Sequence, residues 1–376
     1  MDCPSQHFYR LPELPTPIHL PPSNAEIAEL LSREASEASY VLQRAYRRAA
    51  RSAFLWEAEA RDLVAAERPL TELAHIGPFL QKQIRQWIRQ RQHPPPPPPL
   101  RKEFLTLAES RLRLAKAASW SARLRGDLQM HTNWSDGSGD IRAMAEAAIE
   151  RGYEYIAITD HSKGLSIANG INEVKLKKQS SEINAVNREL RARGQSLTVL
   201  HSIEMNLNPL GEGDMDPKAL RALDLVLGSF HSALRRKEDQ TERYLAGLRN
   251  PHLQILGHPR GRIYNYRSGL GADWETVFRE AARFDKAVEI DAYPDRQDLN
   301  ISLLKIAKSC GTRISMGTDA HHPWQLAFID LALAAALAAK IPPERIVNFM
   351  PLRELRAWVE KVRSAEARHT RVKPKG

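Results

Sequence analysis

The sequence predicts an α/β domain built on one buried parallel sheet, preceded by a smaller helical region. From Gly126 onward, short apolar runs alternate with helical stretches, which is the pattern of repeated βα units. Before that residue the pattern is mainly helical and is interrupted by proline-rich stretches. Repeated βα units with a single buried sheet form either a barrel or a doubly wound sheet, and 376 residues suffice for two domains.

The first third of the chain is divided by its prolines. The Pro-rich start is expected to be extended, and Ser23 is a plausible N-cap for a helix beginning at Ala25. Six consecutive prolines, Pro94 to Pro99, exclude a helix and predict a stiff spacer. One more amphipathic helix is expected at about residues 102–124.

Seven short apolar runs are the candidate strands, and helical segments separate most of them. They lie at residues 126–132, 155–161, 197–206, 224–231, 254–259, 287–292 and 313–320. The chain is therefore expected to divide into a Pro-rich segment, a helical domain, a linker with its connecting helix, the α/β domain and a basic tail, at residues 1–23, 24–93, 94–125, 126–362 and 363–376.

The charge of the chain favours a polyanionic partner without requiring one. The formal net charge is +10. Residues 1–125 hold 19 Lys or Arg and 13 Asp or Glu, so the basic excess is concentrated there.

The cysteines and apolar runs indicate a cytoplasmic protein without a membrane partner. Cys3 and Cys310 are far apart and belong to no CxxC pair, which argues against a disulfide framework and a thiolate zinc site. The start lacks the order of a signal peptide, and the apolar run at residues 331–339 is too short to span a bilayer.

Polar side chains that can bind metal or phosphate stand at or just after the ends of all seven strands. In a parallel barrel these ends share one face. A single such residue is more often a hydrogen-bonded histidine or a helix cap, but eight at equivalent positions predict a metal site. These residues are His131, Asp136, His161, Glu204, His231, His258, Asp319 and His321. Glu289 and Asp291, on the sixth strand, are expected to support the ligands.

Eight ligands are too many for one ion and predict two or three divalent ions. Histidine and carboxylate ligands suit Mn²⁺ or Zn²⁺, with iron as a further alternative. Clustered ions of this kind suit phosphate ester hydrolysis, because they lower the pKa of a bridging water and bind the phosphoryl oxygens.

Six motifs, in order, resemble the polymerase and histidinol phosphatase (PHP) domain over about residues 126–323. They are GDLQMHTNWSDG, ITDHS, LHSIEMN, SFH, GHP and GTDAHH. The resemblance implies a distorted (β/α)7 TIM-like barrel with a three-metal centre that hydrolyses phosphate esters through a metal-bound hydroxide. It implies one metal on His131, Glu204 and Asp319, a second on Glu204, His231 and His258, and a third on Asp136, His161 and His321.

Gln129 is the one departure from the family's usual DLHxH motif. It lies two residues before His131, so both side chains point to the same face of a strand. As a ligand, its neutral amide would hold the first metal loosely or favour manganese; alternatively, it only hydrogen-bonds a neighbouring ligand. A DLQxH motif also resembles the exonuclease domain of some bacterial family X DNA polymerases.

The helical region resembles the small DNA-binding domain of family X polymerases, with a helix-hairpin-helix at residues 75–77. The matching runs are RAYRRAARS (44–52) and LTELAHIGPFLQKQIRQWI (70–88). The resemblance implies DNA contacts by His75, Gly77, Lys82 and Arg85. The alternative is an ordinary helical hairpin with a glycine at its turn.

Two further residues are candidates for catalysis. Asp160 precedes His161 and is expected either to orient a ligand histidine or to protonate a leaving group. Arg260, with Arg262, follows His258 and is expected either to pair with substrate phosphates or to be a solvated loop charge.

The leading function is therefore hydrolysis of phosphodiester bonds in DNA, as a 3′ to 5′ exonuclease or in end processing. The expected partner is DNA, as single strands or 3′ ends. A small-molecule phosphatase of the histidinol-phosphatase type is the first alternative, and a non-catalytic DNA-binding protein is the second.

Overall fold

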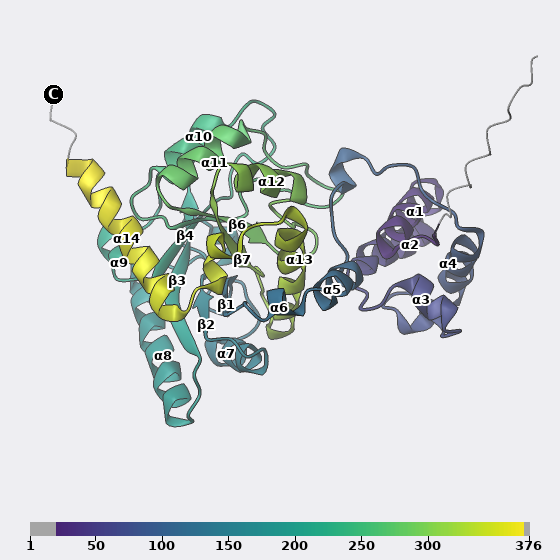
Figure 1. Ribbon diagram of the computed structural model, residues 1–376, viewed down its shortest axis with the longest axis horizontal. Helices are drawn as coiled ribbons and strands as arrows, with labels where there is room; N and C mark the ends of the chain where they lie inside the picture. The colour runs from purple at the N-terminus through teal and green to yellow at the C-terminus, as the bar shows by residue number, and fades with distance from the viewer. Residues whose placement is uncertain (1–19, 372–376) are drawn as a thin grey trace, which may run out of the picture.

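The computed structural model describes residues 20–371, with side chains to residue 365, and contains seven parallel strands that pair in chain order (Figure 1). The strands are β1 (Gly126–Met130), β2 (Tyr155–Ile158), β3 (Thr198–Leu207), β4 (Leu225–Phe230), β5 (Ile255–Leu256), β6 (Ala287–Asp291) and β7 (Arg313–Gly317).

The sheet closes almost completely, because β1 and β7 meet just beyond their carboxyl ends. The backbone N–H of His131 donates to the carbonyl of Ala320 at 2.8 Å, and that of Asp319 donates to Gln129 at 3.1 Å. The hydroxyl of Thr318 donates to the buried carboxylate of Asp127, which ties the two strands together. The predicted distorted barrel is confirmed, since a doubly wound sheet would not bring its first and last strands together.

Helices surround this barrel and connect its strands (Figure 1). They are α7 (Ile141–Glu150), α8 (Glu173–Ala192), α9 (Pro217–Arg221), α10 (Thr241–Leu248), α11 (Trp274–Arg283), α12 (Ile301–Ser309), α13 (Ile329–Ala339) and α14 (Leu352–Arg371).

The barrel interior changes from apolar to polar along the strands. Leu200 and Leu225, early in their strands, pack with Trp358 of α14 in one buried cluster. Side chains alternate along a strand, so later residues on the same face follow every second position. Leu200 is thus followed by Ser202 and Glu204, both fully buried. Apolar packing supports one end of the barrel and leaves the other end for polar chemistry.

The helical region before the barrel consists of four α-helices with their own core, which includes Trp56, Ile84 and Trp87. The helices are α1 (Asn24–Glu37), α2 (Tyr40–Ala53), α3 (Ala60–Ala65) and α4 (Pro78–Gln90). Ser23 caps α1 through a reciprocal pair of hydrogen bonds with Glu26, so this helix begins one residue earlier than predicted.

The prediction of a single helix at about residues 102–124 is wrong. The structure has α5 (Leu107–Ala115) and the short α6 (Ala118–Ser121), preceded by an extended segment. The side chain of Gln297 accepts from the backbone N–H of Leu105 and donates to its carbonyl, both at 2.8 Å. This pairing holds Leu105 extended, and Thr106 then caps α5.

The helical region docks on the barrel through a hairpin at residues 263–267. Tyr264, at 6% exposure, packs edge-on against Phe54 and Phe104, with ring centroids 4.8 and 5.2 Å away. Arg101, in the linker, makes two hydrogen bonds to Glu29 of α1, at 2.7 and 2.8 Å, and a third to Asn265 at 2.9 Å. Residues of the helical region, the linker and the barrel therefore share one interface.

The predicted boundaries at the two ends need one correction. Helix α14 continues to Arg371, well into the tail expected at residues 363–376. Most of the Pro-rich start, residues 1–19, and residues 372–376 lie outside the described residues. Within the described part of the chain, no helix has the length and apolar character needed to cross a membrane.

We predict that Tyr264→Ala lowers the free energy of unfolding by about 3 kcal/mol, because it removes a buried ring from the interface between the helical region and the barrel. Urea titration measures this change. Tyr266→Ala is the matched control in the same hairpin, because Tyr266 is 57% exposed and its replacement should change stability by less than about 0.5 kcal/mol. An equal decrease in the free energy of unfolding for the two variants would contradict a stabilising role for the Tyr264 interface.

Candidate metal centre

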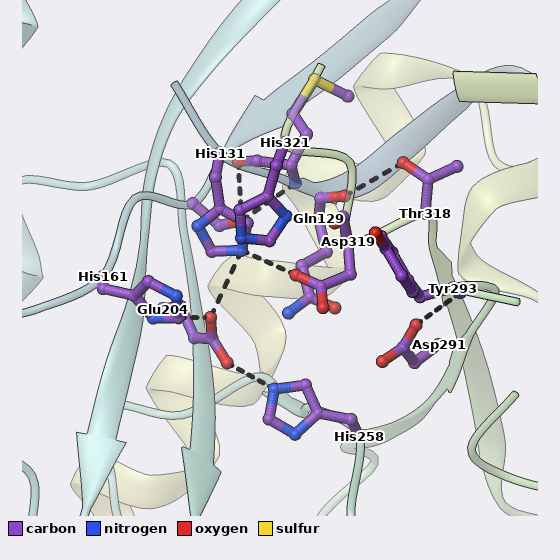
Figure 2. A network of polar contacts seen from close by, with 12 residues as sticks. Gln129, His131, His161, Glu204, His258, Asp291, Tyr293, Thr318, Asp319 and His321 are labelled. Atoms are coloured by element: carbon purple, nitrogen blue, oxygen red, sulfur yellow. Dashed lines mark hydrogen bonds and ion pairs between the residues drawn. The ribbon is translucent and has the colours of Figure 1, made fainter. Parts of the chain in front are cut away.

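The predicted ligands converge at the carboxyl ends of the strands (Figure 2). His131 and His231 each follow directly after a strand, β1 and β4, and Glu204 lies late in β3. The barrel register brings His161 beside Glu204 through a parallel bridge. Side chains that are distant in sequence therefore meet because each occupies the same level of the barrel.

Glu204 lies at the centre of this group and is fully buried. Its Oε1 lies 2.7 Å from Nε2 of His258 and 3.2 Å from Nε2 of His231. Its Oε2 lies 3.0 Å from Nδ1 of His161 and 3.5 Å from Nε2 of His131. One carboxylate thus faces four imidazole rings, as a ligand shared between two metal positions requires.

The same contacts set the charge of this carboxylate. Burial alone raises the pKa of Glu204, but His161, His231 and His258 hold it well below its usual value. Burial opposes protonation of His258, but the Glu204 carboxylate raises the pKa of that histidine to about 10. A negative charge is therefore kept inside the barrel, where a cation can bind it.

Two aspartates complete the cluster. Asp319 Oδ1 lies 2.8 Å from Nε2 of His131, and the carbonyl of Asp319 lies 2.7 Å from Nδ1 of His321. Asp136 lies 3.4 Å from His321, 3.6 Å from His161 and 4.0 Å from His131. The rings of His161 and His321 stack on that of His131, with centroids 4.4 and 4.5 Å away.

The geometry yields three overlapping groups whose ligand atoms all lie within 4.8 Å of one another. They are His131, Asp136, His161 and His321; His161, Glu204 and His231; and His131, Glu204 and Asp319. His131 Nδ1 and Glu204 Oε2 are buried atoms without a hydrogen-bond partner, which fits a role as metal ligands. These groups nearly match the three ligand sets that the resemblance to the PHP domain implies. His258 belongs to the implied set with Glu204 and His231, and here it contacts Glu204 at 2.7 Å.

The comparisons with known proteins identify the family. The PHP domain profile matches residues 127–292. A probable phosphatase of Photobacterium profundum is 32% identical over 187 residues, which cover 47% of this chain and 70% of that protein. The chain belongs to the PHP domain family. With its buried histidines and carboxylates, it is a metal-dependent phosphoesterase of that family.

Other similar proteins differ in size and name. DNA polymerase/3'-5' exonuclease PolX of Bacillus subtilis (strain 168) is 35% identical over 240 residues, or 64% of this chain, but the chain spans only 41% of its length. A crystal structure of histidinol phosphate phosphatase from Lactococcus lactis, complexed with zinc, L-histidinol and phosphate, is 19% identical with a TM-score of 0.43. The matched region covers 57% of this chain and 93% of the Lactococcus lactis protein chain.

Gln129, the departure from the usual PHP motif, is fully buried beside Glu289. With its amide nitrogen toward that carboxylate, it donates to Glu289 Oε2 at 2.8 Å. Glu289 Oε2 also accepts from the backbone N–H of His258 at 2.7 Å. Glu289 therefore supports the site from behind, and Gln129 belongs to this supporting network whether or not its oxygen also reaches a metal.

The expected role of Asp160 needs correction. Its carboxylate accepts hydrogen bonds from both the backbone and the hydroxyl of Thr132, from Ser135 and from Gln179, at 2.5 to 2.8 Å. None of these partners is a ligand histidine. Asp160 instead anchors the loop that carries Asp136, so it positions a candidate ligand through the backbone.

The two loop arginines have different surroundings, and only Arg262 departs from expectation. Arg262 is 4% exposed and donates to the carbonyls of Glu103 and Gln297, so it holds the linker and contacts no solvent-facing site. Burial lowers its pKa to about 10. Arg260 donates to the carbonyl of Ser268, within its own loop, at 2.7 Å. Substrate contact by Arg260 stays a prediction, whereas Arg262 is structural.

Arg296 is a residue of the centre that the sequence pattern did not reveal. Its guanidinium pairs with Asp319 and lies 3.6 Å from Asp291, yet its side chain keeps 32% exposure. Both carboxylates are buried. Arg296 follows β6 by five residues, outside the strand-end pattern that identified the other residues, so no local signal pointed to it.

The predicted DNA-contacting residues lie on the helical region and not at the metal centre. His75, Gly77 and Lys82 are exposed around the start of α4, and a side chain added at Gly77 would meet no neighbouring atom within 4 Å. Arg85 is partly buried and donates to the carbonyl of Arg68. Gly77 and Lys82 are therefore available to a ligand, whereas Nδ1 of His75 already lies 2.5 Å from the hydroxyl oxygen of Ser52 and the guanidinium of Arg85 also has a partner.

We predict that His258→Ala reduces hydrolysis by more than about 100-fold and lowers the bound metal content, because it removes an imidazole from the group around Glu204. Metal analysis of the purified protein and thermal unfolding are measured alongside activity. His252→Ala is the control, because His252 lies just before β5 and outside the metal-ligand groups. Unchanged metal content and activity in His258→Ala would contradict the assignment of this residue.

We predict that Gln129→His tightens metal binding and shifts the preference from manganese toward zinc, because imidazole is a stronger donor than a neutral amide. Titration of metal-depleted protein with each ion measures this change. Identical affinities and an unchanged preference in the variant would restrict Gln129 to its hydrogen bonds with Glu289.

Proposed function

We propose that this chain hydrolyses phosphodiester bonds in DNA, acting as a 3′ to 5′ exonuclease or in end processing. The observation that carries the proposal is the docking of the helical region on the loop that follows His258. Tyr264, six residues after this candidate ligand, inserts between Phe54 and Phe104. The helical region is thereby held against a loop that continues from the metal centre.

The helical region offers a basic groove of about 340 Å³ that includes Arg44, Arg48 and His75. Within the described part of the chain, neither arginine pairs with a carboxylate, although many other surface arginines do, such as Arg68 with Glu72. Unpaired cations on one surface supply the non-specific attraction of proteins to the phosphate backbone.

The start of α4 supports the same interpretation. No side chain caps this helix, and Pro78 occupies its first turn. The free backbone N–H groups there carry the positive end of the helix dipole and can accept a phosphate. The exposed Lys82 lies one turn further along. These features favour contacts with the DNA backbone over contacts with base edges.

The chemistry would be divided between the metals and the chain. Bound divalent ions would lower the pKa of a water and neutralise the phosphoryl oxygens. The chain holds the ligands in place: Asn206 lies 3.1 Å from Nδ1 of His231, and Glu289 fixes the backbone of His258. Arg296 brings a cation to Asp319 from the solvent side, where a substrate phosphate would approach.

The name of the Bacillus subtilis relative, DNA polymerase/3'-5' exonuclease PolX, supports this proposal. A phosphatase acting on small molecules is the second candidate, because a probable phosphatase has 70% of its length covered by this chain. A non-catalytic DNA-binding protein is disfavoured, since the cluster retains all eight predicted histidine and carboxylate ligands.

We predict that the full-length protein with Mn²⁺ degrades 5′-labelled single-stranded DNA from its 3′ end and hydrolyses histidinol phosphate much more slowly. We also predict that Lys82→Glu lowers kcat/KM for DNA by about tenfold, because it places a negative charge beside the phosphates. Arg353→Glu on α14 is the control, since Arg353 is equally exposed but lies outside the helical region. Faster hydrolysis of histidinol phosphate than of DNA would favour the small-molecule phosphatase.

A further inference from the structure

The hairpin at residues 263–267 presents two tyrosines in different environments. Ile263 and Arg267 pair through both backbone hydrogen bonds, at 2.8 and 2.9 Å, which makes the turn tight. Tyr264 is buried against the helical region, whereas Tyr266 is 57% exposed. The packing of Tyr264 therefore fixes the position of the exposed ring of Tyr266.

A second loop of the metal-centre rim lies against this ring. Arg235, four residues after the candidate ligand His231, places its guanidinium carbon 4.6 Å from the centroid of the Tyr266 ring. Gly261 keeps the two loops close, because a Cβ at that position would lie 3.1 Å from the side chain of Leu234. Arg235 and Tyr266 thus form a stacked pair on loops that both continue from metal-ligand strands.

No ion pair joins the basic side chains of this rim to a carboxylate of the described residues. Arg235, Arg236 and Lys237 are exposed, and none of the three pairs with a carboxylate within residues 20–365. On nearby α11, by contrast, Arg279 pairs with Glu275. The loop also carries Glu238 and Asp239, but Asp239 accepts from the backbone N–H of Thr241 at the start of α10.

Two further arginines lie on neighbouring loops. Arg267, at the end of the hairpin, is partly buried and donates to the carbonyl of Gly261. Arg296 pairs with Asp319 and lies 3.6 Å from Asp291, so carboxylates of the centre already offset its charge. The exposed cations of this rim are therefore Arg235, Arg236 and Lys237, and phosphates spaced along a strand would meet their excess of positive charge.

We propose that Tyr266 and Arg235 form a stacking platform for an unpaired base of single-stranded DNA, and that the exposed cations of the same loop attract the adjoining phosphates. This inference rests on the proposed function. An exposed aromatic ring joined to a guanidinium can stack on any base, and cations beside it attract the backbone. Inside a duplex both faces of a base are covered by the stacked neighbouring pairs, so the platform selects single strands over duplex DNA.

The test compares Tyr266→Leu, Tyr266→Phe and Arg235→Ala in the full-length protein. Binding of fluorescently labelled oligo(dT) is measured by anisotropy in the presence of a chelator, so that no strand is cut. Tyr266→Leu should weaken binding about tenfold, Arg235→Ala should weaken it severalfold, and Tyr266→Phe should retain it. Arg279→Ala, which also removes one positive charge, is the control and should bind as the wild type does.

The second measurement, with Mn²⁺ present, is the ratio of kcat/KM on oligo(dT) to kcat/KM on a small chromogenic phosphodiester. Tyr266→Leu should lower this ratio about tenfold, mainly through KM. Wild-type binding by Tyr266→Leu, or an equal loss of affinity for blunt duplex DNA, would overturn the platform. If the wild type binds oligo(dT) through Tyr266 but does not cleave it, the proposed nuclease function fails while the platform stands.

Discussion

One buried carboxylate, Glu204, determines how the site is built. Removing a carboxylate from water costs several kcal/mol unless charges or hydrogen bonds replace the lost hydration. Here four imidazole rings face its two oxygens at 2.7 to 3.5 Å. These rings come from the ends of four different strands, so the carboxylate is compensated only when those strands pair in the correct register. The fold and the metal centre therefore depend on the same register.

The barrel separates the groups that give stability from those that give function. Leu225 and Trp358 belong to the apolar cluster at one end, whereas Glu289 and Asp291 are buried among the polar groups of the other. Burial and the negative charge of Asp291 raise the pKa of Glu289 well above its usual value. Buried carboxyl groups contribute little to stability, because their removal from water costs free energy. Burial of the apolar cluster at the other end of the barrel offsets this cost.

The barrel was predicted correctly, and the candidate ligands could be located in the sequence, because both follow a regular period. A strand fixes the direction of every second side chain, so His131 or His258 at a strand end could be located from the pattern alone. Loops lack such a period. Arg296 at the centre and Arg262 beneath the linker depend on loop paths that the pattern does not encode. The break before α5 depends on Gln297, which is 192 residues away from Leu105 in the chain.

The hairpin at residues 263–267 joins the core of the helical region to the barrel. It continues from the strand end that carries His258, holds the helical region through Tyr264 and leaves Tyr266 exposed beside Arg235. Under the proposed function, a DNA strand bound by the helical region would meet the metal centre in a defined orientation, and binding energy gained far from the scissile bond would position the phosphate for attack. A flexible tether of the same length would raise the local concentration of DNA but would not orient it. Such orientation would depend on the buried ring of Tyr264 and on the hydrogen bonds from Arg101, in the linker, to Glu29 and Asn265.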